Sequence, residues 1–539
     1  MGPEHGLGGM EPELAHLLVG LTRAQSRAVT TDADSLCLMA PAGSGKTRVL
    51  TRRVARRVLD GTADADRVLV VTFTRKAAWE VRSRVAKLGL ARSVRAGTFH
   101  SIALGEVRRW HEETGRQGIR ILPSPAALLR EMACSTRGPG GAARDVLGHS
   151  GSSAYLTIGA EIDWAKALLV DPAAYAARAE AHGRLPGLGL DDVAGAFGAY
   201  EREKSARGLL DFHDILSHCA ELMTEEPRFA QSWAWRVRHL FVDEVQDMNP
   251  LQWQLLEAWR AGRDDLFVVG DPDQSIYEWN GADPTILARI TDLVEGIEII
   301  RLDSNHRSTP QILACARAVL GTAAGSRPGE ATRPEGRLPR IGSFADVQGE
   351  ATEVARWIRL AHDGGRAWSH IAVLARTNRR LLPVARALER MQIPFRLPGP
   401  DGVSREGPAV ELSTFHRAKG LEWPLVAIIG LEDATVPPMG GRTGSLAEEQ
   451  RLLYVAITRC GDELWCSWSE TLPRDLEAAE GLSRPCGPSE LISGLREQVA
   501  ELESMDASDL ETSRRQLARL RATLSQGGGD QPSITSTGA

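Results

Sequence analysis

The feature that most constrains the fold of this chain is a glycine-rich run set between two different apolar patterns. Residues 36–40 (LCLMA) form a short apolar run of the kind that makes a buried strand, and TRVLTRRVARRVL has helical periodicity. Between these two patterns lies PAGSGKT. This order of strand, turn and helix indicates an α/β domain with a specialised loop at its start.

The glycine-rich run fits the pattern A/G-x-x-x-x-G-K-S/T at Ala40, Gly45, Lys46 and Thr47. Glycines there let backbone N–H groups surround a phosphate. Lys46 would reach the terminal phosphates of a nucleotide, and the Thr47 hydroxyl would bind Mg²⁺. A turn that only opens a helix is the alternative interpretation. The expected phosphate-binding residues are Ala42, Gly43, Ser44, Gly45, Lys46 and Thr47.

A second strand pattern, RHLFVDEVQD, ends in two acids, Asp243 and Glu244. Nucleotide hydrolysis needs one carboxylate near the metal and another that orients the attacking water. Asp243 suits the metal-binding role and Glu244 suits the second role. A strand that ends in solvated acids is the alternative, but it is weak beside the upstream loop. The two motifs together predict ATP hydrolysis with Mg²⁺ as cofactor.

The two motifs lie further apart than one α/β domain usually requires, and the intervening residues 104–203 have only helical patterns. We therefore expect a first α/β domain at 1–103 and 204–300 that carries a helical insertion. Strand and helix patterns alternate again over 301–470, without a second phosphate-binding run. Residues 471–539 are expected to form a helical segment and a disordered tail. The nucleotide would lie between the two α/β domains.

Composition excludes some classes of protein. The net charge of −6 means that any nucleic-acid site must be a local basic groove. No apolar run is long enough to span a bilayer, and no secretory signal is visible at the start. Seven scattered cysteines without a CxxC pair indicate reduced thiols. We expect a cytoplasmic protein without membrane contact.

Ten motifs in order resemble those of the UvrD/Rep/PcrA-type superfamily 1A DNA helicases, over most of residues 21–470. They are LTRAQ, APAGSGKTRVL, VTFTRKAAWEVRSRV, GTFHSIAL, GLLDFHDIL, FVDEVQDMNPLQ, VVGDPDQSIYEWNGADP, LDSNHRST, VELSTFHRAKGLEWPLV and EEQRLLYVAITR. The resemblance implies tandem RecA-like P-loop NTPase domains with ATP between them and single-stranded DNA across their top. It also implies 3′→5′ movement.

The resemblance also assigns roles at the nucleotide. Gln25 would read the adenine edge, Arg48 would lie near the base, and Glu422 would hold the ribose. His306 stands where relatives have a tyrosine that stacks on the adenine. Gln274 would sense the γ-phosphate, and Arg307 and Arg459 would reach that phosphate as arginine fingers. For each arginine, a surface ion pair is the alternative role.

The segment GDPDQSIYEWNG joins phosphate chemistry to two large aromatics. The resemblance implies that Tyr277 and Trp279 stack on unpaired bases, an interaction that contributes about 1–3 kcal/mol per base. Burial of both rings under a loop is the alternative. The remaining residues that the resemblance places along the DNA path are Thr72, Phe73, Thr98, Phe99, His100 and His416.

Besides His306, two further departures from the family pattern bear on function. Asn280 replaces an arginine of the relatives, which removes a cation near the DNA or the cleft. Relatives also carry a large helical insertion, the 2B domain, before the strand that enters the TxHxAKG motif, whereas here only a loop near 398–408 is present. We therefore expect a chain that hydrolyses ATP and translocates on single strands, and that unwinds duplex DNA either alone or with a partner.

Two functions are consistent with these patterns. The first is an ATP-dependent translocase or helicase on single-stranded or 3′-tailed DNA, acting in repair, replication or defence. The second is a nucleotide-gated DNA-binding subunit of a larger complex, with a protein partner bound through residues 490–525. Spacings of three and four predict two short amphipathic helices there, built on Leu491, Leu495, Val499, Leu502, Leu517, Leu520 and Leu524. Packing of these helices on their own ATPase core is the alternative.

Overall fold

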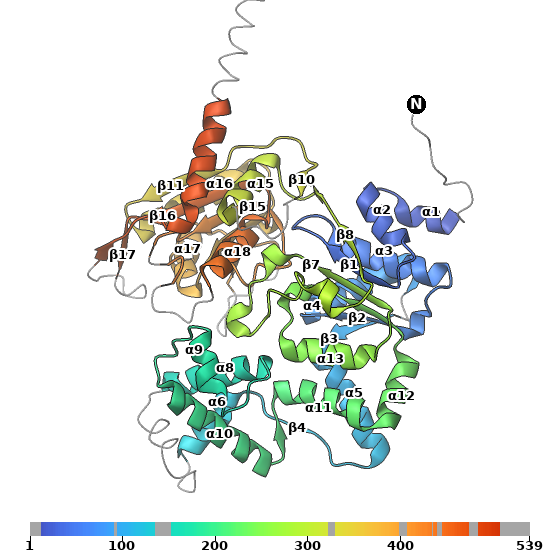
Figure 1. Ribbon diagram of the computed structural model, residues 1–539. Helices are drawn as coiled ribbons and strands as arrows, with labels where there is room; N and C mark the ends of the chain where they lie inside the picture. Colours follow the sequence, from blue (N-terminus) through green and yellow to red (C-terminus); the bar gives the residue numbers. More distant parts are fainter. Residues whose placement is uncertain are drawn as a thin grey trace, which may run out of the picture.

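The computed structural model contains two parallel β-sheets that face each other across a cleft, and a group of helices beside them (Figure 1). It describes residues 12–90, 94–134, 152–321, 329–397, 407–433, 435–438, 445–473 and 483–506. The α/β fold class with tandem RecA-like sheets, predicted from the sequence, is confirmed.

The first sheet has six parallel strands in the order β3-β2-β6-β7-β1-β8. Their bounds are β1 Ser35–Met39, β2 Val68–Thr72, β3 Arg95–Thr98, β6 His239–Val242, β7 Leu266–Gly270 and β8 Glu298–Arg301. Strand β1 lies between β7 and the edge strand β8, with Met39 opposite Gly270 of β7 and Arg301 of β8. Since carboxyl ends of parallel strands share one edge, the segments after β1, β6 and β7 meet there.

Helices cover both faces of this sheet, which explains why strands β1, β2 and β7 are buried along their whole length. One face packs against α2 (Arg23–Thr30), α3 (Lys46–Leu59) and α4 (Arg75–Val85). The other face packs against α5 (Phe99–Thr114), α11 (Phe212–Glu225), α12 (Pro227–Arg236) and α13 (Pro250–Arg260).

A separate group of helices has its own core below the first sheet (Figure 1). It consists of α6 (Pro125–Cys134), α8 (Ser152–Ala167), α9 (Tyr175–Ala181) and α10 (Leu190–Ala206). Its core includes Leu129, Trp164 and Tyr200, whereas Val107 and Trp110 of α5 belong to the core of the first sheet. We therefore propose that the helical insertion begins after α5 rather than at residue 104.

The second sheet is also parallel, in the order β11-β16-β15-β12-β14-β13. Its strands are β11 Arg340–Phe344, β12 Ile371–Ala375, β13 Phe395–Arg396, β14 Val410–Thr414, β15 Trp423–Ile429 and β16 Cys460–Ser469. Helices α16 (Val347–Asp363) and α17 (Asn378–Arg390) cover one face, and α15 (Pro310–Leu320) and α18 (Leu446–Ile457) cover the other.

The connection from β13 to β14 is the place where relatives carry 2B. Most of the expected loop, residues 398–406, lies outside the described residues. Strands β13 and β14 pair directly, with Phe395 opposite Val410. The connection therefore starts and ends at neighbouring positions of one sheet.

The helical segment after the second sheet packs on the chain's own core. Leu491, Leu495 and Val499 are buried in the same cluster as α15 and α18, and Leu502 packs against it. An added Cβ at Gly494 would lie 2.6 Å from the Ala318 carbonyl oxygen, which shows close contact with α15. For this first predicted helix the structure favours self-packing over a partner surface. The second, with Leu517, Leu520 and Leu524, lies outside the described residues.

Candidate functional site

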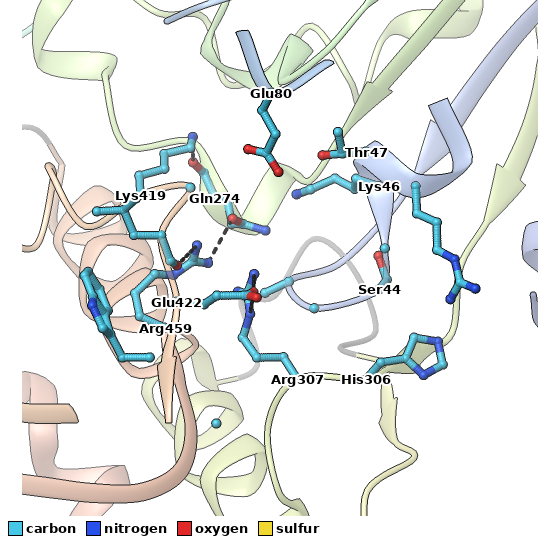
Figure 2. Close-up of a pocket in the computed structure, with 18 of the residues that line it drawn as sticks. Ser44, Lys46, Thr47, Glu80, Gln274, His306, Arg307, Lys419, Glu422 and Arg459 are labelled. Carbon is cyan, nitrogen blue, oxygen red and sulfur yellow. Dashed lines mark hydrogen bonds and ion pairs between the residues drawn. The ribbon is translucent and has the colours of Figure 1, made fainter. Parts of the chain in front are cut away.

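A cleft of about 790 Å³ separates the two sheets (Figure 2). One wall is the loop between β1 and α3, and the other comes from the second sheet, including Gly420 to Trp423. Lysines and arginines outnumber acids in its lining. The cations are Lys46, Arg48, Lys76, Arg84, Arg307, Arg333, Lys419 and Arg459, and the acids are Glu80, Asp243, Glu244, Glu422 and Asp462. This balance suits a polyanionic ligand.

The glycines of the first wall cannot be replaced by larger residues. Gly43 and Gly45 have φ of +71° and +83°, which L side chains rarely adopt. A Cβ at Gly43 would lie 2.8 Å from Asn305 Nδ2, and one at Gly45 would lie 3.0 Å from Gln25 Nε2. The loop is closely enclosed by its neighbours, and the Asn305 amide donates to the Ala42 carbonyl at 2.8 Å.

Polar atoms in this loop are buried without hydrogen-bond partners. Both Ser44 Oγ and Lys46 Nζ are in this condition, and the only ion pair of Lys46 among the described residues is a long one, 4.0 Å to Asp271. A buried, unsatisfied ammonium group is costly unless a ligand supplies acceptors. The loop therefore fits the phosphates predicted for it, with Lys46 directed into the cleft (Figure 2).

The two acids predicted after β6 differ in their electrostatics. Burial and the neighbouring Glu244 raise the pKa of Asp243 to about 7. Burial acts in the same direction on Glu244, but Lys46 and Lys419 outweigh it and lower the pKa of Glu244 to about 2. Glu244 has a left-handed backbone with φ of +58°, and its carboxylate accepts a hydrogen bond from Gln246. Strain of this kind is concentrated at functional sites.

Two further acids at this edge have raised pKa values even though each lies near a lysine, Asp247 beside Lys419 and Asp271 near Lys46. Burial is the main cause that raises the pKa of Asp247 and of Asp271 to about 6 each. Together with Asp243, these buried carboxylates offer the oxygen ligands that Mg²⁺ prefers. The residues thus fit a divalent cation held by Asp243 and Thr47, both of which line the cleft.

The predicted arginine fingers reach the cleft from the second sheet. The Arg459 guanidinium is buried and donates to Gln274 Oε1 at 3.3 Å (Figure 2). Burial, with repulsion from Arg307, lowers the pKa of Arg459 to about 9. Arg307 forms an ion pair with the exposed Glu422 at 2.6 Å and donates to the Thr458 carbonyl. The structure therefore brings Gln274, Arg459 and Arg307 together.

The residues predicted at the base are arranged around the end of the loop. The Gln25 amide donates to the Ser44 carbonyl at 2.8 Å and lies 3.5 Å from His306 Nε2. His306 Nδ1 lies 2.8 Å from the Thr332 hydroxyl. Arg48 donates to the Val19 carbonyl at 3.3 Å. Gln25 thus lies beside His306, which lines the cleft, and the roles of both at the base and of Glu422 at the ribose stay predictions.

One central residue had no predicted role. Lys419 Nζ lies 2.6 Å from Asp247 Oδ2, donates to the Gln274 carbonyl at 2.7 Å, and is 3.9 Å from Glu244. It therefore connects the second sheet to both motifs of the first. The lysine stands in the motif FHRAKGLEW, in which the sequence predicts roles only for His416 and Glu422. The position of Lys419 between a predicted strand and Gly420 is the sequence signal that could have indicated a role for it.

The aromatics of the predicted DNA path form a group beside this cation. Tyr277 is half-buried, with Lys419 Nζ 5.5 Å from its ring centre, and Trp279 is 40% exposed. The His416 ring lies 6.1 Å from the Tyr277 ring and 6.2 Å from the Trp279 ring. Burial, Arg376 and Lys419 lower the pKa of His416 to about 4. These rings are accessible, so the buried alternative does not apply to Trp279.

Two residues expected along the DNA path belong to the core instead. Phe99 is 1% exposed, and its ring stacks on Trp259 with centroids 5.7 Å apart. Thr72 is fully buried, and its hydroxyl donates to the Thr74 carbonyl. Both side chains are buried in this structure, and their contact with DNA stays a prediction. Thr72 is the last residue of β2 and Phe99 follows β3 directly, two positions at which a side chain can point into the core.

The other expected DNA residues lie nearer the surface. Phe73 and His100 are partly exposed, and Thr98 caps α5 by accepting a hydrogen bond from the Ser101 N–H. The His100 ring lies 5.8 Å from Phe212, which is 47% exposed at the start of α11. Phe212 had no predicted role, although it stands in the quoted motif GLLDFHDIL.

Comparison with known proteins decides the family. The profile of the UvrD/REP helicase N-terminal domain matches residues 21–295, and that of the UvrD-like helicase C-terminal domain matches 300–402 and 399–471. The chain belongs to the UvrD/REP helicase family. It is an ATP-dependent DNA helicase by this membership, so the predicted enzyme class is confirmed.

Individual members of the family match over most of the chain. ATP-dependent DNA helicase UvrD2 of Mycobacterium tuberculosis (strain ATCC 25618 / H37Rv) is 30% identical over 594 residues, covering 90% of this chain and 82% of that protein. ATP-dependent DNA helicase PcrA of Leuconostoc citreum is 30% identical over 391 residues, covering 70% of this chain and 50% of PcrA. Across the described part of the chain, no helix has the length and apolar character needed to cross a membrane.

Proposed function

We propose that this helicase moves along single-stranded DNA in the 3′→5′ direction, driven by hydrolysis of ATP with Mg²⁺ in the cleft. One observation carries the proposal. Gln274 in the cleft, and Tyr277 and Trp279 beside His416, belong to one short segment after β7. A change at the phosphate would therefore move the surface on which bases stack.

At the phosphate end, the unsatisfied Lys46 ammonium would bind the terminal phosphates. Arg459 would exchange its contact with Gln274 for the γ-phosphate, and Arg307 would leave Glu422. Each arginine gains a strong partner only while that phosphate is present, so ATP favours a closed cleft and hydrolysis releases it.

For the chemical step, Glu244 would orient the attacking water, because its lowered pKa keeps the carboxylate ionised. Thr47 and Asp243 would hold Mg²⁺, which neutralises phosphate charge when bound. Gln25, His306 and Arg48 would contact the base.

At the DNA end, Tyr277, Trp279 and His416 would stack on or contact unpaired bases, a mode that tolerates any base sequence. Phe73, Thr98 and His100 would continue this path on the first sheet. We place the action of the enzyme on single-stranded or 3′-tailed DNA in repair, replication or defence. Residues 397–409, between β13 and β14, are too few to form a 2B domain, so we propose that translocation proceeds without one.

A DNA-binding subunit without its own motor activity is the competing function. It rested partly on a partner surface at 490–525, and the described half of that surface is buried against its own chain. The cleft, in contrast, has the unsatisfied charges that catalysis needs.

The test is the ATPase rate with single-stranded, tailed and blunt DNA, run beside strand displacement on 3′-tailed and 5′-tailed duplexes. We expect single strands to stimulate turnover and only the 3′-tailed duplex to be unwound. An ATPase rate that single-stranded DNA does not raise would exclude a motor. Unwinding of the 5′-tailed duplex alone would reverse the proposed polarity.

A further inference from the structure

The turn that carries Trp279 is attached to the helical insertion as well as to the two sheets. This turn, 277–281, includes Gly281, whose φ is +91°. A Cβ there would lie 2.7 Å from the Ala167 Cβ at the end of α8. The turn therefore packs against the helical insertion without space for a side chain.

One side chain of the insertion also binds the turn directly. Arg184 follows α9 and donates from Nη1 to the Trp279 carbonyl oxygen at 3.2 Å. The N–H group of Trp279 is held from the other side, where it donates to Glu448 Oε1 of α18 at 3.3 Å. The peptide groups on both sides of the indole are thus fixed, one by the insertion and one by the second sheet.

Arg184 is itself held rigidly. Its Nε and Nη2 donate to the two oxygens of Glu161, each at 2.8 Å, in a bidentate pair. Glu161 is fully buried, and the Arg184 guanidinium lies 4.4 Å from the centre of the Trp164 ring. A fork of this kind uses the planar geometry of arginine, which lysine cannot reproduce.

We propose that Arg184 is a positioning residue that sets the orientation of the Trp279 indole relative to the helical insertion. Nucleotide-dependent movement at Gln274 then reaches the insertion through the turn, since both ends of the turn have fixed partners. The inference rests on the proposed function, in which Trp279 stacks on DNA bases.

The test uses the full chain with Arg184→Ala and Arg184→Lys, and Arg178→Ala as a control on the exposed surface of α9. The readouts are the melting temperature, the basal ATPase rate, and the quenching of 2-aminopurine in a bound single strand. We expect unchanged basal turnover in Arg184→Ala, and a rise of roughly threefold to tenfold in the DNA concentration that half-stimulates the ATPase. The quenching of 2-aminopurine should fall in Arg184→Ala and should be restored little in Arg184→Lys. The control Arg178→Ala should resemble the wild type in every readout.

A double-mutant cycle with Trp279→Ala separates the positioning role of Arg184 from the proposed role of Trp279 in binding DNA. If Arg184 acts through the indole, its substitution adds no further loss in the Trp279→Ala background. Additive losses, or equal quenching in Arg184→Ala and wild type, would overturn the positioning role. Unchanged DNA binding in Trp279→Ala alone would instead contradict the proposed DNA path. If Trp279→Ala weakens DNA binding while Arg184→Ala behaves as the wild type, the proposed DNA path stands and only the positioning role of Arg184 is rejected.

Discussion

Two buried clusters of charge, one in each half of the molecule, differ in how their charges are compensated. In the second half, Arg380 is 1% exposed and is paired with Glu350 and with Glu432 at 2.8 Å. Ser467 and Ser469 donate further hydrogen bonds to Glu350. This cluster joins α17 to the carboxyl edge of the second sheet, and Arg380 is paired with both carboxylates, although Glu432 Oε2 has no hydrogen-bond partner among the described residues.

The cleft cluster lacks that balance. Lys46 Nζ has no hydrogen-bond partner in the described residues, and the buried Asp243 and Asp271 have raised pKa values. Buried charges thus form a structural cluster where the protein itself supplies their partners, and a ligand-binding site where it does not. The comparison predicts loss of stability from changes to the first cluster and loss of activity from changes to the second.

The largest expected effect is on stability. Arg380→Ala would leave two buried carboxylates without a cation, and breaking a buried pair in this way costs about 3–5 kcal/mol of unfolding free energy. Urea denaturation of the wild type and variant measures the loss. A free energy within 1 kcal/mol of the wild type would show that the pairing is not structural.

The matching change in the cleft is Lys46→Ala. We expect turnover to fall by about 10²–10³-fold or more, because a principal donor to the phosphates is lost. DNA affinity and the melting temperature should be retained, since no internal partner loses its hydrogen bond. Steady-state ATPase assays and DNA titration check both parts, and normal hydrolysis would contradict the phosphate assignment.

Asp243→Asn should stabilise the nucleotide-free protein while abolishing turnover. The folded-state pKa of about 7 exceeds the ordinary value of 3.8, so between these values the native state retains a proton that the unfolded state has released. Wild-type stability therefore falls as pH rises from about 4 to about 7. The free energy of unfolding of Asp243→Asn should fall less over this pH range, and at pH 7 it should exceed that of the wild type by about 1–3 kcal/mol. Parallel stability profiles across this pH range would contradict the assignment.

A smaller effect is expected at the DNA end. Trp279→Ala removes an exposed stacking surface, and the affinity for single strands should fall by about 1–3 kcal/mol. Fluorescence anisotropy of a labelled oligonucleotide measures this change, with Trp235→Ala, a similarly exposed tryptophan on α12, as the matched control. Equal losses in both variants would indicate a non-specific cause.

Much of the fold could be predicted from local patterns. The apolar runs before the phosphate-binding loop and before Asp243 are central strands, because a sheet covered on both faces requires apolar residues at every position. The loop glycines and Lys46 follow from phosphate geometry alone. These features depend on residues that are close together in the sequence, so the sequence alone could predict them.

Features that depend on distant residues could not be predicted in this way. The resemblance places Phe99 along the DNA path, but its ring stacks on Trp259 of α13 in the core. The leucine spacing after residue 490 predicted a helix, although not the surface that covers it. Lys419 and Arg184 act through partners more than 90 residues away in the chain, as the pairs of Lys419 with Asp247 (|i−j| = 172) and Arg184 with Trp279 (|i−j| = 95) show.

The central claim is that the γ-phosphate controls how the segment after β7 holds DNA. Its most direct test is the affinity for a fluorescent single strand, measured without nucleotide, with ADP and with a non-hydrolysable ATP analogue. We predict that the three affinities differ severalfold in the wild type and converge in Gln274→Ala. Identical affinities in all three states of the wild-type protein would contradict the claim.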